Sequence, residues 1–160
     1  MPEYTREFVL ESWCIEGLKP KGAVLDALVD LHKSFLELTE LPTVALLEQI
    51  AYCFSNGVLR NQFGMNVKIG NDFPPPGGPL ITYALENILQ SHKEGQHPYI
   101  LHQSFERLHP FMDGNGRVGR LLWAWCMDQR GYSWRKLGFL QTWYYQSLQH
   151  GRRSCPSTIN

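Results

Sequence analysis

The chain has 160 residues, and its 15 Lys and Arg against 15 Asp and Glu leave no formal net charge at pH 7. This length fits one compact domain, and a balanced charge argues against a dedicated nucleic-acid binder, which needs a net basic face. Hydrophobic residues make up 43% and aromatic residues 12% of the chain. That composition can bury a core, so we expect a folded globular protein.

Four cysteines are widely separated and never form a CxxC pair: Cys14, Cys53, Cys126 and Cys155. This spacing favours reduced thiols in a reducing compartment over a disulfide framework. The N-terminal run MPEYTREFVLESW lacks the uninterrupted apolar region of a signal peptide, and no apolar stretch approaches transmembrane length. We therefore expect a cytoplasmic protein with no membrane or nucleic-acid partner. Its single domain is predicted over residues 1–150, followed by a solvated tail over 151–160.

The apolar pattern is mostly helical, with recurrences at three- and four-residue steps. Thr43 can cap one helix, Pro79 and Pro98 stand at helix starts, and Gly131 marks a stop. The predicted helices cover about residues 3–16, 23–39, 43–54, 79–90, 98–108, 115–131 and 133–144.

One segment does not fit a helix. Residues 57–78 contain five Gly and three Pro, with a short alternating run from Met65 to Ile69. A period of two over so few residues predicts a small β-hairpin or strand on the surface.

The run that carries chemistry is HPFMDGNGRVGR, from His109 to Arg120, which connects two predicted helices. Gly114, Asn115 and Gly116 can form a concave anion site with the first turn of the following helix, whose dipole favours negative charge. Arg117 and Arg120 are three residues apart on that helix, so both project from one face. Two guanidinium groups over such a nest suit a polyphosphate.

Two further residues of this run have chemical roles to offer. Asp113 lies at the edge of the loop, where its carboxylate could hold Mg²⁺ that bridges phosphates. His109 has a side chain suited to general-base chemistry near neutral pH. Pro110 is expected to restrict His109 to an extended backbone that presents the imidazole at the mouth of the nest.

Alternative interpretations exist for these residues. Each of them alone is more often a packing, capping or solvated residue, and only their conjunction points to a site. The letters from Gly114 to Gly119 also satisfy the dinucleotide pattern GxGxxG. That pattern needs a preceding strand and a βαβ unit, which the helical pattern here does not provide.

HPFMDGNGRVGR resembles the signature of the Fic family, HxFx[D/E]GNGRxxR, and fills every fixed position. His102 resembles the family's upstream histidine, and residues 60–76 resemble its flap. The resemblance implies a mainly α-helical, Fic-type bundle with a small β-hairpin flap over the active site. It also implies transfer of AMP from ATP to a hydroxyl group of a target protein.

The resemblance further implies residue roles. His109 is the base, Phe111 is the buried anchor of the loop, and Asp113 holds Mg²⁺. The implied ATP and phosphate ligands are the anion nest, with Asn115 at the α-phosphate, and two arginines at the β- and γ-phosphates: Gly114, Asn115, Gly116, Arg117 and Arg120. A target's Tyr, Thr or Ser hydroxyl would be presented by strand addition to the flap edge, which comprises Met65, Asn66, Val67, Lys68 and Ile69.

Many Fic proteins carry an inhibitory helix with the pattern [S/T]xxxE[G/N]. Ser12 and Glu16, followed by Gly17, fit it and resemble the class with an N-terminal inhibitory helix, whose Glu pairs with the second motif arginine. The simpler interpretation is that Glu16 only ends a helix at Gly17. Thr82 and Glu86 also fit the pattern, at a place where the family does not put its inhibitory helix.

Other functions remain open at this stage. Some relatives transfer phosphate or phosphocholine instead, although Arg117 favours AMP, and some remove AMP from proteins. A non-catalytic nucleotide- or peptide-binding module would not need His109. A metal cluster at His102 and His109 lacks a third ligand nearby in the sequence. The Trp-rich stretch 123–143 is interpreted as core, with an oligomer surface as the alternative, and self-modification is a further expectation.

Overall fold

The structure, a computed structural model, describes residues 2–132 and 134. These residues belong to two compact units, one comprising residues 2–34 with Trp134 and the other residues 35–132. The single domain expected over residues 1–150 stays a prediction. The tail 151–160 lies outside the described residues, and so does the helix expected over 133–144, apart from Trp134.

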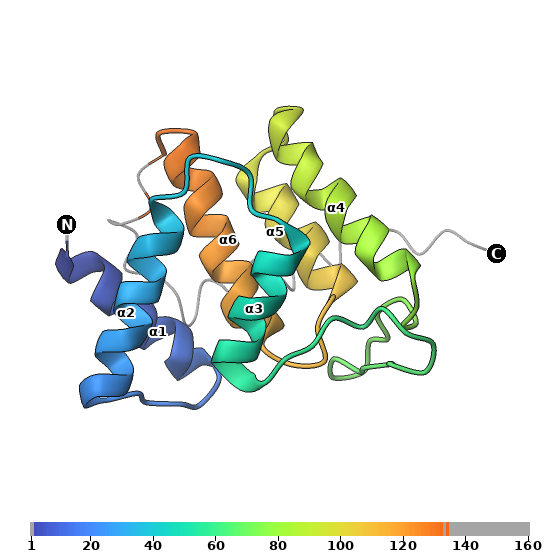
Figure 1. Ribbon diagram of the computed structural model, residues 1–160, viewed down its shortest axis with the longest axis horizontal. Coiled ribbons are helices and arrows are strands. Elements are labelled where there is room, and N and C mark those ends of the chain that lie inside the picture. The colour runs from blue at the N-terminus through green and yellow to red at the C-terminus, as the bar shows by residue number, and fades with distance from the viewer. Residues whose placement is uncertain (1, 133, 135–160) are drawn as a thin grey trace. The chain divides into compact units, whose positions relative to one another are not determined.

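The described part of the chain is mainly helical, as predicted, and the structure confirms each helix expected before residue 132 (Figure 1). None of these helices is both long and apolar enough to cross a membrane. The six described helices are α1 (Pro2–Ile15), α2 (Gly22–Leu36), α3 (Val44–Ser55), α4 (Leu80–Lys93), α5 (Pro98–Leu108) and α6 (Asn115–Gln129).

Side chains fix several of these helix ends. The Thr43 hydroxyl accepts a hydrogen bond from the backbone N–H of Leu46 at 3.1 Å, which caps α3 as the sequence predicts. His97 caps α5 by accepting from the backbone N–H of Tyr99 at 3.2 Å, with Pro98 at the first helical position. Local sequence therefore determines where α3 and α5 begin.

The first unit contains a buried histidine. His32 is fully buried, with the rings of Phe8 and Trp13 edge-on to it at centroid distances of 6.1 and 5.6 Å. Its Nδ1 lies 2.8 Å from the carbonyl oxygen of Leu28. Burial lowers the pKa of His32 to about 4, against a smaller opposing effect of that carbonyl. His32 is thus a core residue of this unit.

The second unit holds the run HPFMDGNGRVGR, from His109 to Arg120. Here α5 packs against α4 and α6, and α3 packs against α4 and α6. Phe105 of α5 and Leu122 of α6 are completely buried. Trp125 of α6 is also buried, and its indole N–H donates to the carbonyl of Leu38 at 2.9 Å. This part of the Trp-rich stretch is core, as interpreted from the sequence.

The flap, residues 60–76, differs from the prediction because it does not form a β-hairpin. Only Ile69 and Asp72 pair within it, through two backbone hydrogen bonds of 2.9 and 2.8 Å around a two-residue turn. Phe73 and then prolines 74–76 follow Asp72, and the prolines have no N–H to donate, so the pairing cannot continue as a ladder. The alternation itself is present, since residues 65, 67 and 69 are half-buried and residues 66, 68 and 70 are exposed.

Candidate active site

The motif loop, residues 109–114, begins where α5 ends. His109 is the C-cap of α5 in the left-handed conformation (φ 49°, ψ 62°), and its N–H donates to the carbonyl of Phe105 at 2.9 Å. The expectation that Pro110 keeps His109 extended is therefore wrong. Proline disfavours mainly the right-handed helical region for its predecessor, and closure of the helix end selects the left-handed one. The imidazole is half-buried at this helix terminus.

A buried asparagine, Asn115, holds the motif loop in shape. The Asn115 side chain accepts from the N–H of Phe111 at 2.8 Å and donates to the carbonyl of the same residue at 2.7 Å. Asn115 is 2% exposed and Phe111 is completely buried. Phe111 thus occupies the anchor position implied by the resemblance. The amide of Asn115 fixes the loop, and a direct role at a phosphate stays a prediction.

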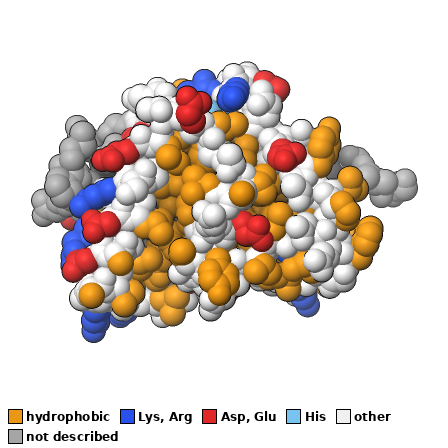
Figure 2. All heavy atoms as spheres, viewed as in Figure 1, with side chains coloured by type: hydrophobic (Ala, Val, Ile, Leu, Met, Phe, Trp, Pro, Cys, Tyr) orange, Lys and Arg blue, Asp and Glu red, His pale blue; other side chains and the backbone are white. Residues whose placement is uncertain are grey.

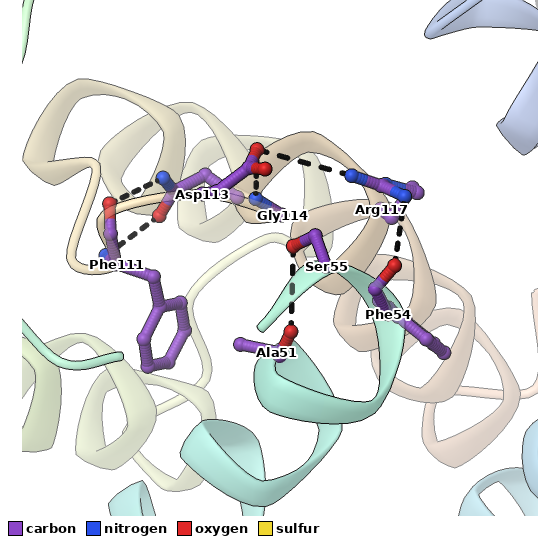
Figure 3. A network of polar contacts seen from close by, with 8 residues as sticks. Ala51, Phe54, Ser55, Phe111, Asp113, Gly114 and Arg117 are labelled. Carbon is purple, nitrogen blue, oxygen red and sulfur yellow. Dashed lines mark hydrogen bonds and ion pairs between the residues drawn. The ribbon is translucent and has the colours of Figure 1, made fainter. Parts of the chain in front are cut away.

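Asp113 and Arg117 face each other across the start of α6 (Figure 3). One carboxylate oxygen of Asp113 accepts from the Gly114 N–H at 2.7 Å and lies 3.8 Å from Nη2 of Arg117. Nη1 of Arg117 donates to the carbonyl of Phe54, at the end of α3, at 3.1 Å. The side chain of Asp113 is 68% exposed and that of Arg117 is 6% exposed. The arrangement offers an accessible carboxylate beside a largely buried cation.

The start of α6 can receive an anion. Gly114 is its N-cap in the left-handed conformation (φ 80°) and makes no side-chain cap. The first amides of a helix lack intrahelical acceptors and carry the positive end of its dipole. Gly116, in the first turn, is half-buried. These backbone groups have the chemistry that the sequence predicted for a phosphate nest.

Arg120, the second arginine of the motif, is more deeply buried than Arg117. Arg120 is 2% exposed, and so is His102, whose Nδ1 lies 3.0 Å from the carbonyl oxygen of Gly119. Burial, together with the charge of Arg120, lowers the pKa of His102 to about 3, while the Gly119 carbonyl opposes the shift. His102 is thus neutral at physiological pH and supports the turn of α6 that carries Arg120.

Two residues of the segment after α3 escaped the sequence interpretation. A Cβ atom at Gly57 would overlap the backbone carbonyl oxygen of Asp113, so only glycine allows this approach to the motif loop. Arg60 is completely buried and donates to backbone carbonyls of both the flap and the end of α5. Only its place at the edge of a Gly- and Pro-rich segment could have drawn attention to it.

The flap presents apolar groups beside its predicted docking edge. Asn66 accepts from the N–H of Gly77 at 2.9 Å, and the Lys68 ammonium lies 5.5 Å from the centre of the Phe73 ring. Figure 2 shows hydrophobic side chains on the surface around the flap and α4. The large exposed hydrophobic residues of these two segments are Phe63, Phe73, Leu80 and Tyr83.

The predicted inhibitory residues lie in the first unit. Ser12 is completely buried in α1, and Glu16 is exposed at its end. Gly17 (φ 74°) donates to Cys14, and Leu18 donates to Trp13, both at 3.0 Å, which is a Schellman end. The Glu-Gly pair thus ends a helix, and an inhibitory contact stays a prediction. Glu86 is exposed inside α4, where its pattern does not mark a helix end.

Within residues 2–132 and 134, no group of three or more His, Cys, Asp or Glu side chains could hold a metal ion. Asp113 supplies the one carboxylate of the run from His109 to Arg120. Mg²⁺ commonly takes one or two protein carboxylates, and substrate phosphates and water complete its shell. A single exposed carboxylate therefore fits an ion that arrives with a nucleotide.

The Fic/DOC family model matches residues 25–127. Two curated relatives, each named protein adenylyltransferase Fic, come from Drosophila ananassae and Drosophila virilis. Both are 36% identical over 80 residues, which cover 46% of this chain. The match spans 15% and 16% of their own lengths. No solved structure matches the chain. Since the family model covers well over half of the sequence, the chain belongs to the Fic/DOC family.

Proposed function

We propose that this chain transfers AMP from ATP to a hydroxyl group of a target protein. The observation that carries the proposal is the motif loop, which holds His109 and Asp113 on one rigid turn against the start of α6. The two relatives named protein adenylyltransferase support the same reaction. Nucleotidyl transfer depends on positioning and on charge neutralisation, which a preorganised loop supplies.

Each residue of the loop has one part in the proposed reaction. The target oxygen forms a bond to the α-phosphorus while the bond from that phosphorus to the oxygen bridging the β-phosphate breaks. His109 accepts the proton of the attacking hydroxyl, and pyrophosphate leaves. Asp113 binds the Mg²⁺ that accompanies ATP as part of the substrate.

Backbone and arginine groups neutralise the phosphates in this proposal. The amides at the start of α6, around Gly114 and Gly116, face the phosphate chain with the positive end of the helix dipole. Arg117 binds toward the β-phosphate and Arg120 toward the γ-phosphate. Because Arg117 is held by the carbonyl of Phe54 and lies near Asp113, its guanidinium needs little reorganisation.

The target docks along residues 65–69 of the flap. Its side chains alternate between half-buried and exposed, and its backbone has no strand partner before Ile69 in the described flap. An added strand from the target would pair with that backbone and present its hydroxyl to His109. A Tyr, Thr or Ser side chain meets this requirement, in another protein or in a second copy of this chain.

Inhibition through Glu16 is the second part of the proposal. The motif of Ser12 and Glu16 and its place at the end of α1 support it. Glu16 would pair with Arg120 and displace the γ-phosphate, so its removal should raise transfer. Removal of AMP from a modified protein is the alternative reaction of the same site.

The test uses purified protein with ATP radiolabelled at the α-phosphate or at the γ-phosphate, with and without cell lysate. We expect protein-bound label from the first nucleotide only, and loss of label by about 10²–10⁴-fold in His109→Ala. Label from the γ-phosphate would contradict AMP transfer. Glu16→Ala should raise incorporation, while Glu86→Ala is the matched control from the second copy of the pattern and should not.

A further inference from the structure

Arg60, at the start of the flap, connects the flap to the motif loop through its side chain. It is completely buried. Its Nε donates to the carbonyl of His109 at 2.7 Å and its Nη2 to that of Leu108 at 2.9 Å. Its Nη1 donates to the carbonyls of Met65 and Pro75, both at 3.0 Å. One guanidinium thus uses four of its five N–H groups to join the end of α5 to both arms of the flap.

The backbone of Arg60 repeats this connection. Its N–H donates to the carbonyl of Pro110 and its carbonyl accepts from Gly78, both at 2.9 Å. The preceding residue, Leu59, forms an antiparallel bridge with Phe111. The side chain and main chain of one residue therefore hold the motif loop and the base of the flap together.

A buried arginine is an expensive way to make such a connection. Removing a cation from water costs several kcal/mol, and burial lowers the pKa of Arg60. No carboxylate among the described residues lies within ion-pair distance of it. Its charge is instead met by carbonyl dipoles, two of them at the C-terminus of α5, where a cation is favoured. This cost in folding stability is reasonable if the position of the flap relative to the motif loop matters for function.

We infer that Arg60 is a positioning residue that sets the docking edge of the flap at a fixed distance from His109. The inference rests on the proposed function, because there the target hydroxyl is held by the flap and its proton is taken by His109. Misplacement of reacting groups by about 1 Å can cost on the order of 10²-fold in rate. Arg60 donates hydrogen bonds to both segments whose relative position matters, the end of α5 with His109 and the flap.

If Arg60 has this role, its loss should affect the target protein and ATP differently. The side chain of Arg60 donates to the carbonyls of Leu108, His109, Met65 and Pro75, and none of these residues lies in the proposed phosphate-binding run 114–120. Loss of the guanidinium should therefore impair transfer to the target without weakening ATP binding. A general loss of structure would affect both.

The variants are Arg60→Met, which keeps length and packing, Arg60→Lys, which keeps the charge but not the fork, and Arg60→Ala. We expect transfer to fall on the order of 10²-fold in Arg60→Met, with an intermediate loss in Arg60→Lys. The dissociation constant for ATP, measured by calorimetry with Mg²⁺, should stay within about twofold. Arg130→Met is the matched control, because Arg130 also donates to a helix-terminal carbonyl, that of His92 at 2.6 Å, but lies on the surface.

Chemical rescue distinguishes positioning from damage to the fold. Ethylguanidinium at concentrations too low to denature the protein should restore part of the transfer by Arg60→Ala, and ethylammonium should not, since it lacks the planar fork. Transfer by Arg60→Met at the wild-type rate would overturn the inference. So would an equal loss of ATP affinity, or rescue by both cations alike.

Hydrogen exchange tests the same connection without activity. In Arg60→Lys we expect faster exchange of the flap-base amides of Gly77 and Gly78, with unchanged exchange in α6. If the wild-type protein incorporates no α-label, the proposed function fails, while this exchange result still decides whether Arg60 fixes the flap. If the wild type is active and flap exchange does not change, the inference fails and the proposed function stands.

Discussion

The motif loop and the flap lie side by side and are built in opposite ways. The loop is anchored by the buried Phe111 and by two hydrogen bonds between Phe111 and Asn115. Its residue Gly114 lies close to α3, since a Cβ atom there would overlap the Ser55 hydroxyl. The flap has one backbone pair, at Ile69 and Asp72, and Phe63 and Phe73 are 87% and 77% exposed. Groups that handle a constant substrate can be fixed in advance, whereas an edge that receives a protein must stay accessible. The contrast is thus between a preorganised site and an open one.

The largest expected effect on stability comes from replacing an asparagine, and the start of α6 beside the motif loop and the flap each contain one that bonds the backbone. Asn115→Leu leaves the N–H and carbonyl of Phe111 buried without partners, so we expect a loss of about 2–6 kcal/mol in the free energy of unfolding. Asn66→Leu takes the partner from one buried group, the N–H of Gly77, and should cost about 1–3 kcal/mol, half as much because only one group is left unsatisfied. Urea denaturation of both variants measures the difference. Equal losses would remove the contrast between loop and flap.

The next test of the contrast replaces one glycine packed against the motif loop and one glycine of the flap by alanine. Gly57→Ala places a Cβ against the carbonyl of Asp113 and should cost about 1–3 kcal/mol, because backbone must move. It should also lower transfer, since Asp113 shifts with the loop. In the flap, Gly70 has φ 56° and open space around it, so Gly70→Ala carries only the cost of a strained backbone, about 1 kcal/mol. Thermal denaturation and label incorporation are the readouts, and normal transfer by a folded Gly57→Ala would contradict the close packing.

A third test uses pH, because the α5–α6 side contains the buried His102 and the flap has no histidine. The pKa of His102 is lowered to about 3 in the folded protein, so the unfolded chain binds the extra proton first as pH falls below about 6.5. Stability is therefore full above that pH and declines toward acid. His102→Asn, which can still donate to the Gly119 carbonyl, should remove about 1–2 kcal/mol of the decline between pH 6.5 and pH 5.

The control for this pH dependence is His97→Asn. His97 is exposed at the start of α5, where asparagine is an equally good cap. Some decline remains in both variants, since the buried His32 of the first unit also has a lowered pKa, to about 4. Parallel stability curves for the wild type and His102→Asn would show that His102 is protonated as readily in the folded protein as in the unfolded one.

The contrast also explains what the sequence could predict. The run from His109 to Arg120 is local, so its residue types indicate the loop, the nest and the helix that follows. The helices follow from caps and periodicity. Arg60 could not be found in this way, because its partners Leu108 and His109 are 48 and 49 residues away. The left-handed backbone of His109 was also missed, because closure of the end of α5 selects it over the extended conformation that is common before proline.

The flap shows the limit of local patterns more sharply. Alternation from Met65 to Ile69 predicts a strand, and the alternating exposure is present. A ladder needs donors on the opposite arm as well, and prolines 74–76 provide none. A strand pattern thus predicted which side chains face outward but not the pairing. Between Met65, whose carbonyl accepts from Arg60, and Ile69, which pairs with Asp72, the described flap forms no strand pairing, and the proposed function places the partner strand there.

The smallest effect on stability is expected at Phe73. Because its ring is 77% exposed and contacts the Lys68 ammonium at 5.5 Å from its centre, Phe73→Ala should change the free energy of unfolding by no more than about 0.5 kcal/mol. If the open flap receives the target, the same variant should raise the KM for the target and leave the KM for ATP unchanged. Tyr52→Ala is the control, since Tyr52 is 59% exposed on α3, outside the flap. An exposed aromatic ring beside the docking edge adds contact area only when a partner covers it. If Phe73→Ala and Tyr52→Ala therefore have the same KM for the target, the target does not dock on this part of the flap.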